Sequence, residues 1–308
     1  MKQNYFKKKR KKGKMRKNPG NLFHGREWKM ALRGIGFVLP SFAGVCIFML
    51  APFLDVLRCS FTSVATGKFV GWNNYQMVFT NDAFLLAGKN TIRFLAIGLP
   101  LLLVLSLLLA VFLAEWGRMG ERLKNMFLFP MAIPVVSVAM FWELLFANKG
   151  FVNAILHLAG GQESNWLNTN AAFVILIGSF LWKNLGYDIL LWMAGLVMIP
   201  HSVYEAAMMD GAGKIRCFFS VTLPNLVPSF FVIAVLSLMN AFKIFREAYL
   251  VAGDYPHESI YLMQHLYNNW FRELSIDKMS AAAVVHAIVI GAFVIILRKL
   301  CTKDGELL

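Results

Sequence analysis

Two long apolar stretches of the sequence contain side chains of the types that bind a polar solute. The candidates in residues 171–199 and 227–250 are Lys183, Tyr187, Asn240, Lys243, Phe245 and Arg246, with Glu247 next to the last of them. Pockets for small molecules are mostly apolar, with a few polar groups placed to hydrogen-bond the ligand. The faces of aromatic rings in such a pocket can stack on the ligand. These residues therefore indicate an aromatic-lined pocket for an uncharged, hydroxylated ligand.

A purely structural role for the same residues is the alternative. A charge inside a membrane span costs about 2.5–3.5 kcal/mol on insertion scales, so it needs a partner or water. Lys243 and Glu247 are spaced to pair one helical turn apart. Lys183 and Arg246 have long side chains that can extend their charged ends to water. Both interpretations remain open for Lys183, Tyr187 and Lys243.

Other kinds of chemistry lack a matching pattern in the sequence. The four cysteines are scattered, the six histidines form no HExxH motif, and no GxxxxGK[ST] phosphate loop is present. The carboxylates form no recognisable acid–base pair or nucleophile set. We therefore predict that the chain is not an enzyme, binds no metal and has no cofactor of its own.

Composition predicts an all-α polytopic membrane protein. Hydrophobic residues make up 58% of the 308 residues and the mean hydropathy is +0.57, whereas ordinary soluble proteins are about 45–50% apolar. An apolar run of about 20 residues can cross the hydrocarbon core as a helix. The predicted spans are residues 35–54, 94–114, 126–147, 171–199, 227–250 and 279–297.

The distribution of basic residues predicts the orientation. Residues 1–33 contain 13 of the 31 lysines and arginines, and further ones lie near Arg118, in residues 200–224 and at the C-terminus. Cytoplasmic loops are enriched in Lys and Arg, so both termini and the central loop are expected in the cytoplasm. The basic tail is expected to contact anionic lipid, and no aromatic interleaving or folded module indicates nucleic-acid binding.

The central loop, residues 200–224, separates two spans. Ser202 and Glu205 have the spacing of a capping box, which predicts a short helix over residues 203–210. Gly211 and Gly213 are expected to end that helix, because glycine adopts the positive φ of a sharp helix exit. A second short helix is expected from residue 214 to residue 220, stopped near Pro224.

Residue spacing in this loop is characteristic. The pattern consists of Glu205, Ala206, Ala207, Gly211, Val221, Thr222, Leu223 and Pro224. It resembles the EAA loop of the membrane subunits of binding-protein-dependent ABC importers, which usually have isoleucine where this chain has Val221.

The likeness to carbohydrate-type permeases extends over residues 39–297. The motifs that carry it are GWNNY (71–75) with Asn90 and Thr91, FPMAIP (129–134) with Trp142, WLN (166–168), LWKNLGY (181–187), AGLVMIP (194–200), AFKIFREAYLVAG (241–253) and ESIYLMQHLY (258–267). One departure is local: many members have an aspartate where this chain has Arg246, followed by Glu247.

The resemblance implies a type I ABC importer permease fold. Its domains would be a basic cytoplasmic tail (1–33), a six-helix permease domain (34–298) with the coupling loop (200–224), and a C-terminal tail (299–308). The ATPase-coupling residues would be Glu205, Ala206, Ala207, Asp210, Gly211, Leu223 and Pro224. The residues that line the substrate pathway would be Lys183, Tyr187, Asn240, Lys243, Phe245 and Arg246.

The resemblance also implies the partners. These are a second permease subunit forming a heterodimer, two cytoplasmic ATPase subunits that bind the ATP, an extracytoplasmic substrate-binding protein and a saccharide. The chain would then be a multi-pass protein of the bacterial cell membrane that moves a sugar or oligosaccharide by alternating access. An ion-coupled secondary transporter is the alternative, which would couple through intramembrane acids and often has inverted repeats.

Overall fold

The computed structural model describes residues 34–303 and 306–307, in two units, 1–55 and 56–308. Each unit is considered separately. In the first, residues 34–45 are helical, continue as the π-helical turn η1 (Cys46–Leu50) and lead into α2 (Ala51–Ser60). The basic tail lies outside the described residues.

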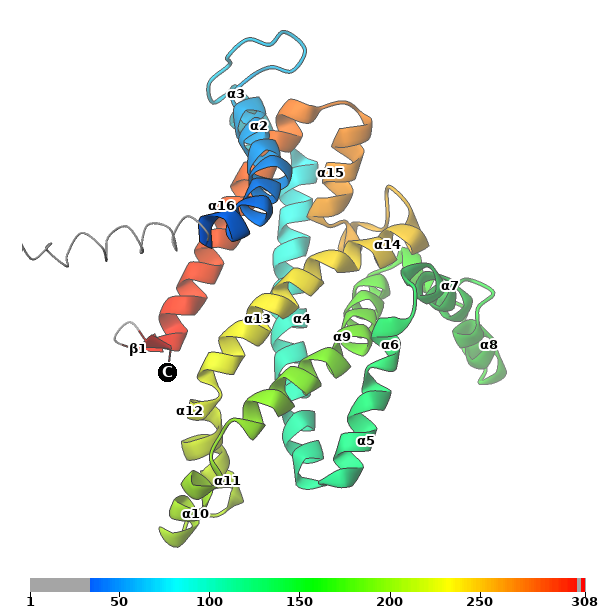
Figure 1. Ribbon diagram of the computed structural model, residues 1–308. Helices are drawn as coiled ribbons and strands as arrows, with labels where there is room; N and C mark the ends of the chain where they lie inside the picture. Colours follow the sequence, from blue (N-terminus) through cyan, green and yellow to red (C-terminus); the bar gives the residue numbers. More distant parts are fainter. Residues whose placement is uncertain (1–33, 304–305, 308) are drawn as a thin grey trace, which may run out of the picture. The chain divides into compact units, whose positions relative to one another are not determined.

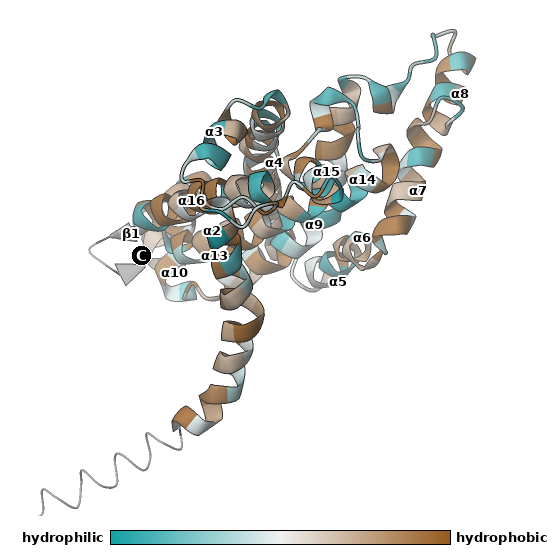
Figure 2. Cartoon of the chain, turned by 90° about the horizontal axis from the view of Figure 1, so that it is seen from above, coloured by the Kyte–Doolittle hydropathy of each residue, from teal (hydrophilic) through white to brown (hydrophobic). Residues whose placement is uncertain are grey.

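Six helical segments in the described residues are long and apolar enough to cross a membrane. They are Gly34–Ser60, Asp82–Glu115, Val135–Leu158, Ala171–Val197, Val227–Ala252 and Ile276–Cys301. The predicted all-α, six-span class is therefore confirmed. Hydrophobic residues dominate these helices, and hydrophilic ones are concentrated in α3 and in connecting segments (Figure 2). The two strands in the described residues are short, β1 (Thr302–Lys303) and β2 (Glu306–Leu307), paired antiparallel.

The predicted ends of several elements were wrong. The second span is α4 (Asp82–Glu115), which begins 12 residues before the predicted start at residue 94, because the Asn81 side chain caps it by accepting from the Phe84 N–H at 3.0 Å. The basic segment around Arg118 is the helix α5 (Arg118–Phe127) rather than a loop. Segments outside the predicted spans contain further helices: α3 (Asn73–Phe79), α8 (Phe151–Leu158), η2 (Trp166–Asn168), η5 (Glu258–Ile260) and α15 (Met263–Arg272).

Proline breaks the third span, as predicted from Pro130 and Pro134. The segment consists of α6 (Phe129–Ala132), an extended Ile133 and α7 (Val135–Phe146). Proline disfavours the helical region for the residue before it, and Ile133, which precedes Pro134, is extended with ψ of 129°. This break brings an irregular backbone segment next to α9 (Ala171–Val197).

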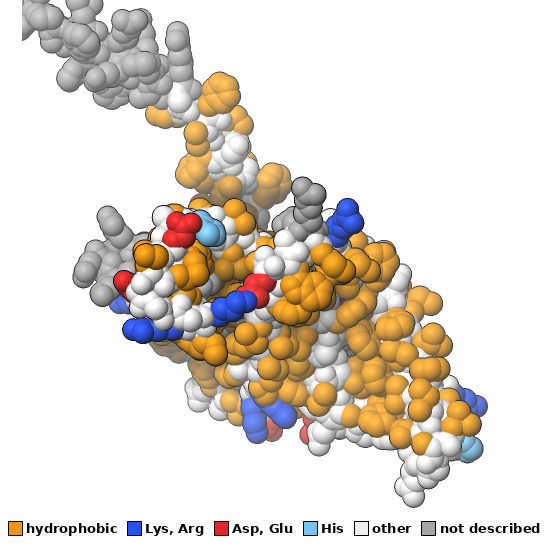
Figure 3. All heavy atoms as spheres, turned by 90° about the horizontal axis from the view of Figure 1, so that it is seen from below, with side chains coloured by type: hydrophobic (Ala, Val, Ile, Leu, Met, Phe, Trp, Pro, Cys, Tyr) orange, Lys and Arg blue, Asp and Glu red, His pale blue; other side chains and the backbone are white. Residues whose placement is uncertain are grey.

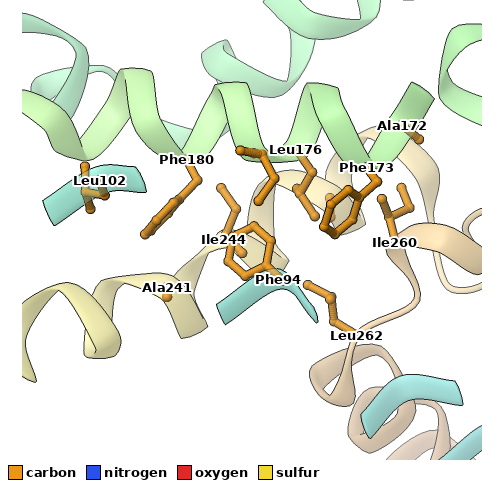
Figure 4. Close-up of a cluster of buried hydrophobic side chains, with 12 residues drawn as sticks. Phe94, Leu102, Ala172, Phe173, Leu176, Phe180, Ala241, Ile244, Ile260 and Leu262 are labelled. Atoms are coloured by element: carbon orange, nitrogen blue, oxygen red, sulfur yellow. The ribbon is translucent and has the colours of Figure 1, made fainter. Parts of the chain in front are cut away.

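The second unit is built around the pairing of α4 with α9, which α13 (Val227–Ala241) flanks (Figure 1). Phe94 and Phe180 form the centre of one core, with ring centroids 5.3 Å apart in a T-shaped arrangement (Figure 4). Deeper in the bundle, the buried Trp192 donates its indole N–H to Ser106 Oγ at 3.0 Å. This hydrogen bond removes the cost of an unpaired buried polar group.

Gly186 allows α9 to approach the turn between α5 and α6. A Cβ at this position would overlap the backbone carbonyl oxygen of Phe127. Small residues permit such close helix packing in membrane bundles.

Two motifs far apart in the sequence meet at the end of the bundle that carries α15. Asn90 Nδ2 donates to the carbonyls of Glu258 (2.5 Å) and Tyr261 (3.0 Å), and Thr91 Oγ1 accepts from the Met263 N–H at 3.0 Å. We call these three hydrogen bonds the Asn90 clamp. They hold the segment before α15 against α4.

The same end of the bundle contains titratable groups outside the spans. Burial lowers the pKa of His265 to about 4, although the Asp254 carboxylate partly opposes this change. Asp254 is paired with Arg272, whose hydrogen bond lowers the carboxyl pKa. The neutral His265 accepts from the Leu262 N–H at 3.2 Å.

Candidate functional site

A polar cavity of about 260 Å³ lies between α9, the α6–α7 break and the later part of the fifth span. That part consists of the end of α13, the 3-10 turn η4 (Phe242–Ile244) and α14 (Phe245–Ala252). The polar lining residues are Lys183, Asn184, Asn240, Lys243, Arg246 and Glu247. Met131, Ile133 and Val135 supply an aliphatic wall. The structure thus brings Lys183, Asn240, Lys243 and Arg246 together at one site.

Lys183 forms an ion pair with Glu247 across α9 and α14. The side chains are only 16% and 4% exposed, so the pair is largely withdrawn from solvent. The structural alternative predicted an ion pair between Lys243 and Glu247 on one helix, and this prediction is wrong. The predicted extension of the Lys183 side chain to water is also wrong. Turn η4 interrupts the α-helical phase between these residues, and Lys243 Nζ instead donates to Asn240 Oδ1 at 2.9 Å.

Tyr187 and Phe245 do not line the cavity. The Phe245 ring packs edge-on against His265, with centroids 4.7 Å apart, and contacts Tyr249. Tyr187 is half-buried on α9. The expected aromatic lining is therefore replaced by aliphatic side chains in this cavity, because η4 turns Phe245 toward α15.

One buried polar contact was missed from the sequence. Asp188 is fully buried, and its Oδ2 accepts from Ser237 Oγ at 2.6 Å, which joins α9 to α13. An aspartate within an apolar run is a signal for a buried partner. No local spacing identifies Ser237, which is 49 residues away.

The central loop forms α10 (His201–Met209) followed by a sharp turn. The helix starts two residues earlier than predicted, with Pro200 at the N-cap position and no side-chain cap. The predicted capping box is therefore wrong, because Ser202 lies inside the first turn, and Glu205 Oε1 instead lies 3.1 Å from His201 Nδ1. Gly211 follows the helix with φ of +78°, as the predicted helix exit requires. The same expectation is wrong for Gly213, which is extended with φ of −73°.

After the turn, the chain stays helical through Pro224. The segments are α11 (Lys214–Cys217), the π-helical turn η3 (Phe218–Thr222) and α12 (Leu223–Asn225). The predicted stop near Pro224 is wrong, since this proline lies in the first turn of α12, where its missing N–H costs little. Tyr204 OH lies 3.0 Å from Thr222 Oγ1 and joins α10 to η3.

The tip of this segment is apolar and exposed. Met209 and Ile215 are 88% and 77% exposed. The predicted coupling residues also lie at the surface. Ala207 is half-buried, and the others are exposed: Glu205, Ala206, Asp210, Gly211, Leu223 and Pro224. Hydrophobic side chains cover much of the face seen from below, with charged ones in a few groups (Figure 3). An exposed apolar tip of this kind is typical of a surface that binds another protein.

A family model described as "Binding-protein-dependent transport system inner membrane component" matches residues 102–303, which include the cavity residues and the central loop. The chain belongs to this family. It is therefore a permease subunit of an ABC importer and a multi-pass inner-membrane protein, not an enzyme.

Individual relatives agree with the family assignment. This permease is 32% identical to the probable ABC transporter permease protein YesP of Bacillus subtilis, over 87% of this chain and 90% of that protein. It is 29% identical to the trehalose/maltose transport system permease protein MalF of Thermococcus litoralis, over 91% and 97% of the two chains.

A solved structure has the same fold. It is a bacterial alginate ABC transporter in complex with an alginate pentasaccharide-bound periplasmic protein, with a TM-score of 0.77 and 21% identity over 91% of this permease and 98% of that chain.

Proposed function

We propose that this permease subunit moves a saccharide across the membrane as one half of an alternating-access pathway. The observation that carries the proposal is the polar cavity formed by Lys183, Asn240, Lys243 and Arg246 in a chain of this family. Many secondary transporters bind substrate near the bilayer midplane, where broken helices supply polar groups, and we expect the same arrangement in this importer subunit. The breaks at Ile133 and at η4 border this cavity. The trehalose/maltose and alginate relatives support a saccharide as substrate.

The proposed assembly contains a second permease subunit, two ATPase subunits and an extracytoplasmic binding protein. ATP would bind to the ATPases, and α10 would dock in a groove on one of them. Both termini of the permease chain would lie on the same side of the membrane as the ATPases, the cytoplasmic side. Met209 and Ile215 supply an apolar tip for that contact. Closure of the ATPases would then move α10 and, through Tyr204 and Thr222, the helices that follow.

Co-purification tests the assembly. The chain is expressed with its neighbouring permease and ATPase subunits, purified through a tag on this chain, and assayed for ATP hydrolysis with the binding protein. Glu205→Ala is expected to retain the partners but to lose stimulated hydrolysis, whereas Glu273→Ala, an exposed acid between α15 and α16, is the control. A chain that purifies alone and moves saccharide down an ion gradient would support the secondary-transporter alternative.

A glycine pair two residues apart tests the coupling segment. Gly211 has φ of +78°, which β-branched residues avoid, whereas Gly213 is extended with φ of −73°. Gly211→Val is expected to abolish ATP-driven uptake with assembly retained, and Gly213→Val is expected to transport. Equal uptake by both variants would contradict the coupling role of this turn.

A further inference from the structure

The charges around the polar cavity do not balance. Three cationic side chains line it, Lys183, Lys243 and Arg246, against one carboxylate, Glu247. Because Glu247 is held by Lys183, that pair contributes no net charge. Lys243 and Arg246, both exposed in this chain, leave the cavity with two uncompensated positive charges.

Hydrogen-bond donors are also in excess. Lys243 uses one N–H on Asn240 Oδ1 at 2.9 Å, and an ammonium group has three. The Arg246 guanidinium, with five N–H donors, has no ion pair or side-chain hydrogen bond within residues 34–303. Asn240 Oδ1 is already engaged by Lys243. The cavity therefore offers a ligand many donors and few free acceptors.

Charges at membrane depth persist where they face a partner or a functional cavity. A guanidinium fork matches the geometry of a carboxylate or another oxyanion. The ligand that complements two cations and unused donors is an anion with several acceptor oxygens. The aliphatic wall of Met131, Ile133 and Val135 can accept the carbon skeleton of that ligand.

We infer that the saccharide carried by this permease is anionic, and that Arg246 and Lys243 bind its acidic group. This inference rests on the proposed saccharide transport. It replaces the uncharged ligand predicted from the sequence, because the one carboxylate in the cavity is bound to Lys183. The cavity volume of about 260 Å³ is slightly below the about 300–1,000 Å³ of complete ligand pockets, as expected if the second permease subunit supplies the remaining wall.

The test is equilibrium binding to the assembled permease and ATPase complex in nanodiscs without the binding protein, so that the selectivity of that protein does not enter. Saturation-transfer NMR gives Kd for three matched disaccharides: a neutral one, its uronate counterpart and its monophosphate counterpart. The two anionic ligands distinguish carboxylate from phosphate as the acidic group. The variants are Arg246→Gln, Arg246→Lys, Lys243→Gln and the Lys243→Gln/Arg246→Gln double variant, and Lys299→Gln, at the end of α16, is the control.

At least one anionic disaccharide is expected to bind about tenfold or more tightly than the neutral one, since hydrogen bonds to charged groups are the strong ones. The double variant is expected to remove this preference, so that the anionic and the neutral disaccharides bind with similar Kd. Arg246→Lys is expected to retain part of the preference, and higher salt to reduce it.

Equal affinity for neutral and anionic disaccharides, or an anionic preference that survives the double variant, would overturn the inference alone. Dissociation of the second permease subunit from the double variant would also overturn it, because the two cations would then belong to the subunit interface. If no disaccharide binds and none stimulates ATP hydrolysis with the binding protein, the proposed saccharide transport fails as well.

Discussion

Lys183 and Glu247 stabilise the bundle only as a pair. Removing one member of a buried ion pair leaves an uncompensated charge and typically costs about 3–5 kcal/mol, whereas replacing both with apolar groups is often neutral. Lys183→Met and Glu247→Leu are therefore each expected to lower the melting temperature of the purified complex. The double variant is expected to recover most of the loss.

A double-mutant cycle on the melting temperature checks the pair. Asp188→Leu serves as the reference for an uncoupled site. Asp188 lies on the same helix as Lys183, but it contacts Ser237 of α13. The loss of melting temperature in Asp188→Leu is therefore expected to add to that in Lys183→Met. A Lys183→Met/Glu247→Leu variant as unstable as the sum of its single variants would contradict the coupling.

His265 makes the fold sensitive to acid. Its pKa is about 4 in the folded protein and about 6.5 in an unfolded chain. Between these pH values the unfolded chain binds more protons, so stability falls as the pH decreases from about 6.5 to about 4, by up to about 3 kcal/mol. The melting temperature is expected to decrease over this range, and less steeply in His265→Gln. His157→Gln, at an exposed position of α8, is expected to leave the slope unchanged, and an unaltered slope in His265→Gln would argue against this origin.

At the scale of elements, α9 has one face that tolerates no added atoms and another that does. A Cβ at Gly186 overlaps the Phe127 carbonyl, whereas a Cβ at Gly178 has nothing within 4 Å. Gly186→Ala is expected to destabilise the protein by about 1–3 kcal/mol through overpacking, and Gly178→Ala to have little effect. Yield and melting temperature by fluorescence-detected size-exclusion chromatography measure both. Equal behaviour would mean that α9 does not approach the α5–α6 turn this closely.

The existence of the spans was predictable from the sequence, but their ends were not. Hydropathy identifies the apolar centre of α4 and stops at the polar residues of its first turns, although the Asn81 cap lies just before them. Hydropathy finds only continuous apolar runs, so it passes over the mainly polar helix α5, although Met119, Leu123 and Met126 recur there with a helical period. Proline, in contrast, acts locally, so the break at Pro134 was predictable.

The site could be predicted as a set of residues, not as a set of contacts. Lys183, Asn240, Lys243 and Arg246 were identifiable as polar groups in apolar runs, and all four line one cavity. The partner of Lys183 was not identifiable, because Glu247 is 64 residues away and its direction depends on the 3-10 turn before it. The same turn decides that Phe245 faces His265.

For the whole molecule, the distribution of basic residues predicts that α10, α11 and the α4–α5 turn lie on one side of the membrane and α15 on the other. Figure 1 places the first three at the same end of the bundle and α15 at the opposite end. In a cysteine-free background, a membrane-impermeant maleimide added to intact cells is expected to label Glu273→Cys and not Met119→Cys. In permeabilised cells both variants should be labelled. Labelling of Met119→Cys in intact cells would show that the orientation is the opposite of the predicted one.

The Asn90 clamp sets an order on the biogenesis of the protein. Its acceptors and donors at Glu258, Tyr261 and Met263 are made about 170 residues after Asn90. Four of the six spans precede the last of these residues by more than 60 positions. Nascent chains must therefore enter the bilayer with the clamp open, and it closes only when translation is nearly complete. Chains that stop before Met263 cannot close it, which gives the quality-control proteases of the cell a local difference between truncated and finished copies.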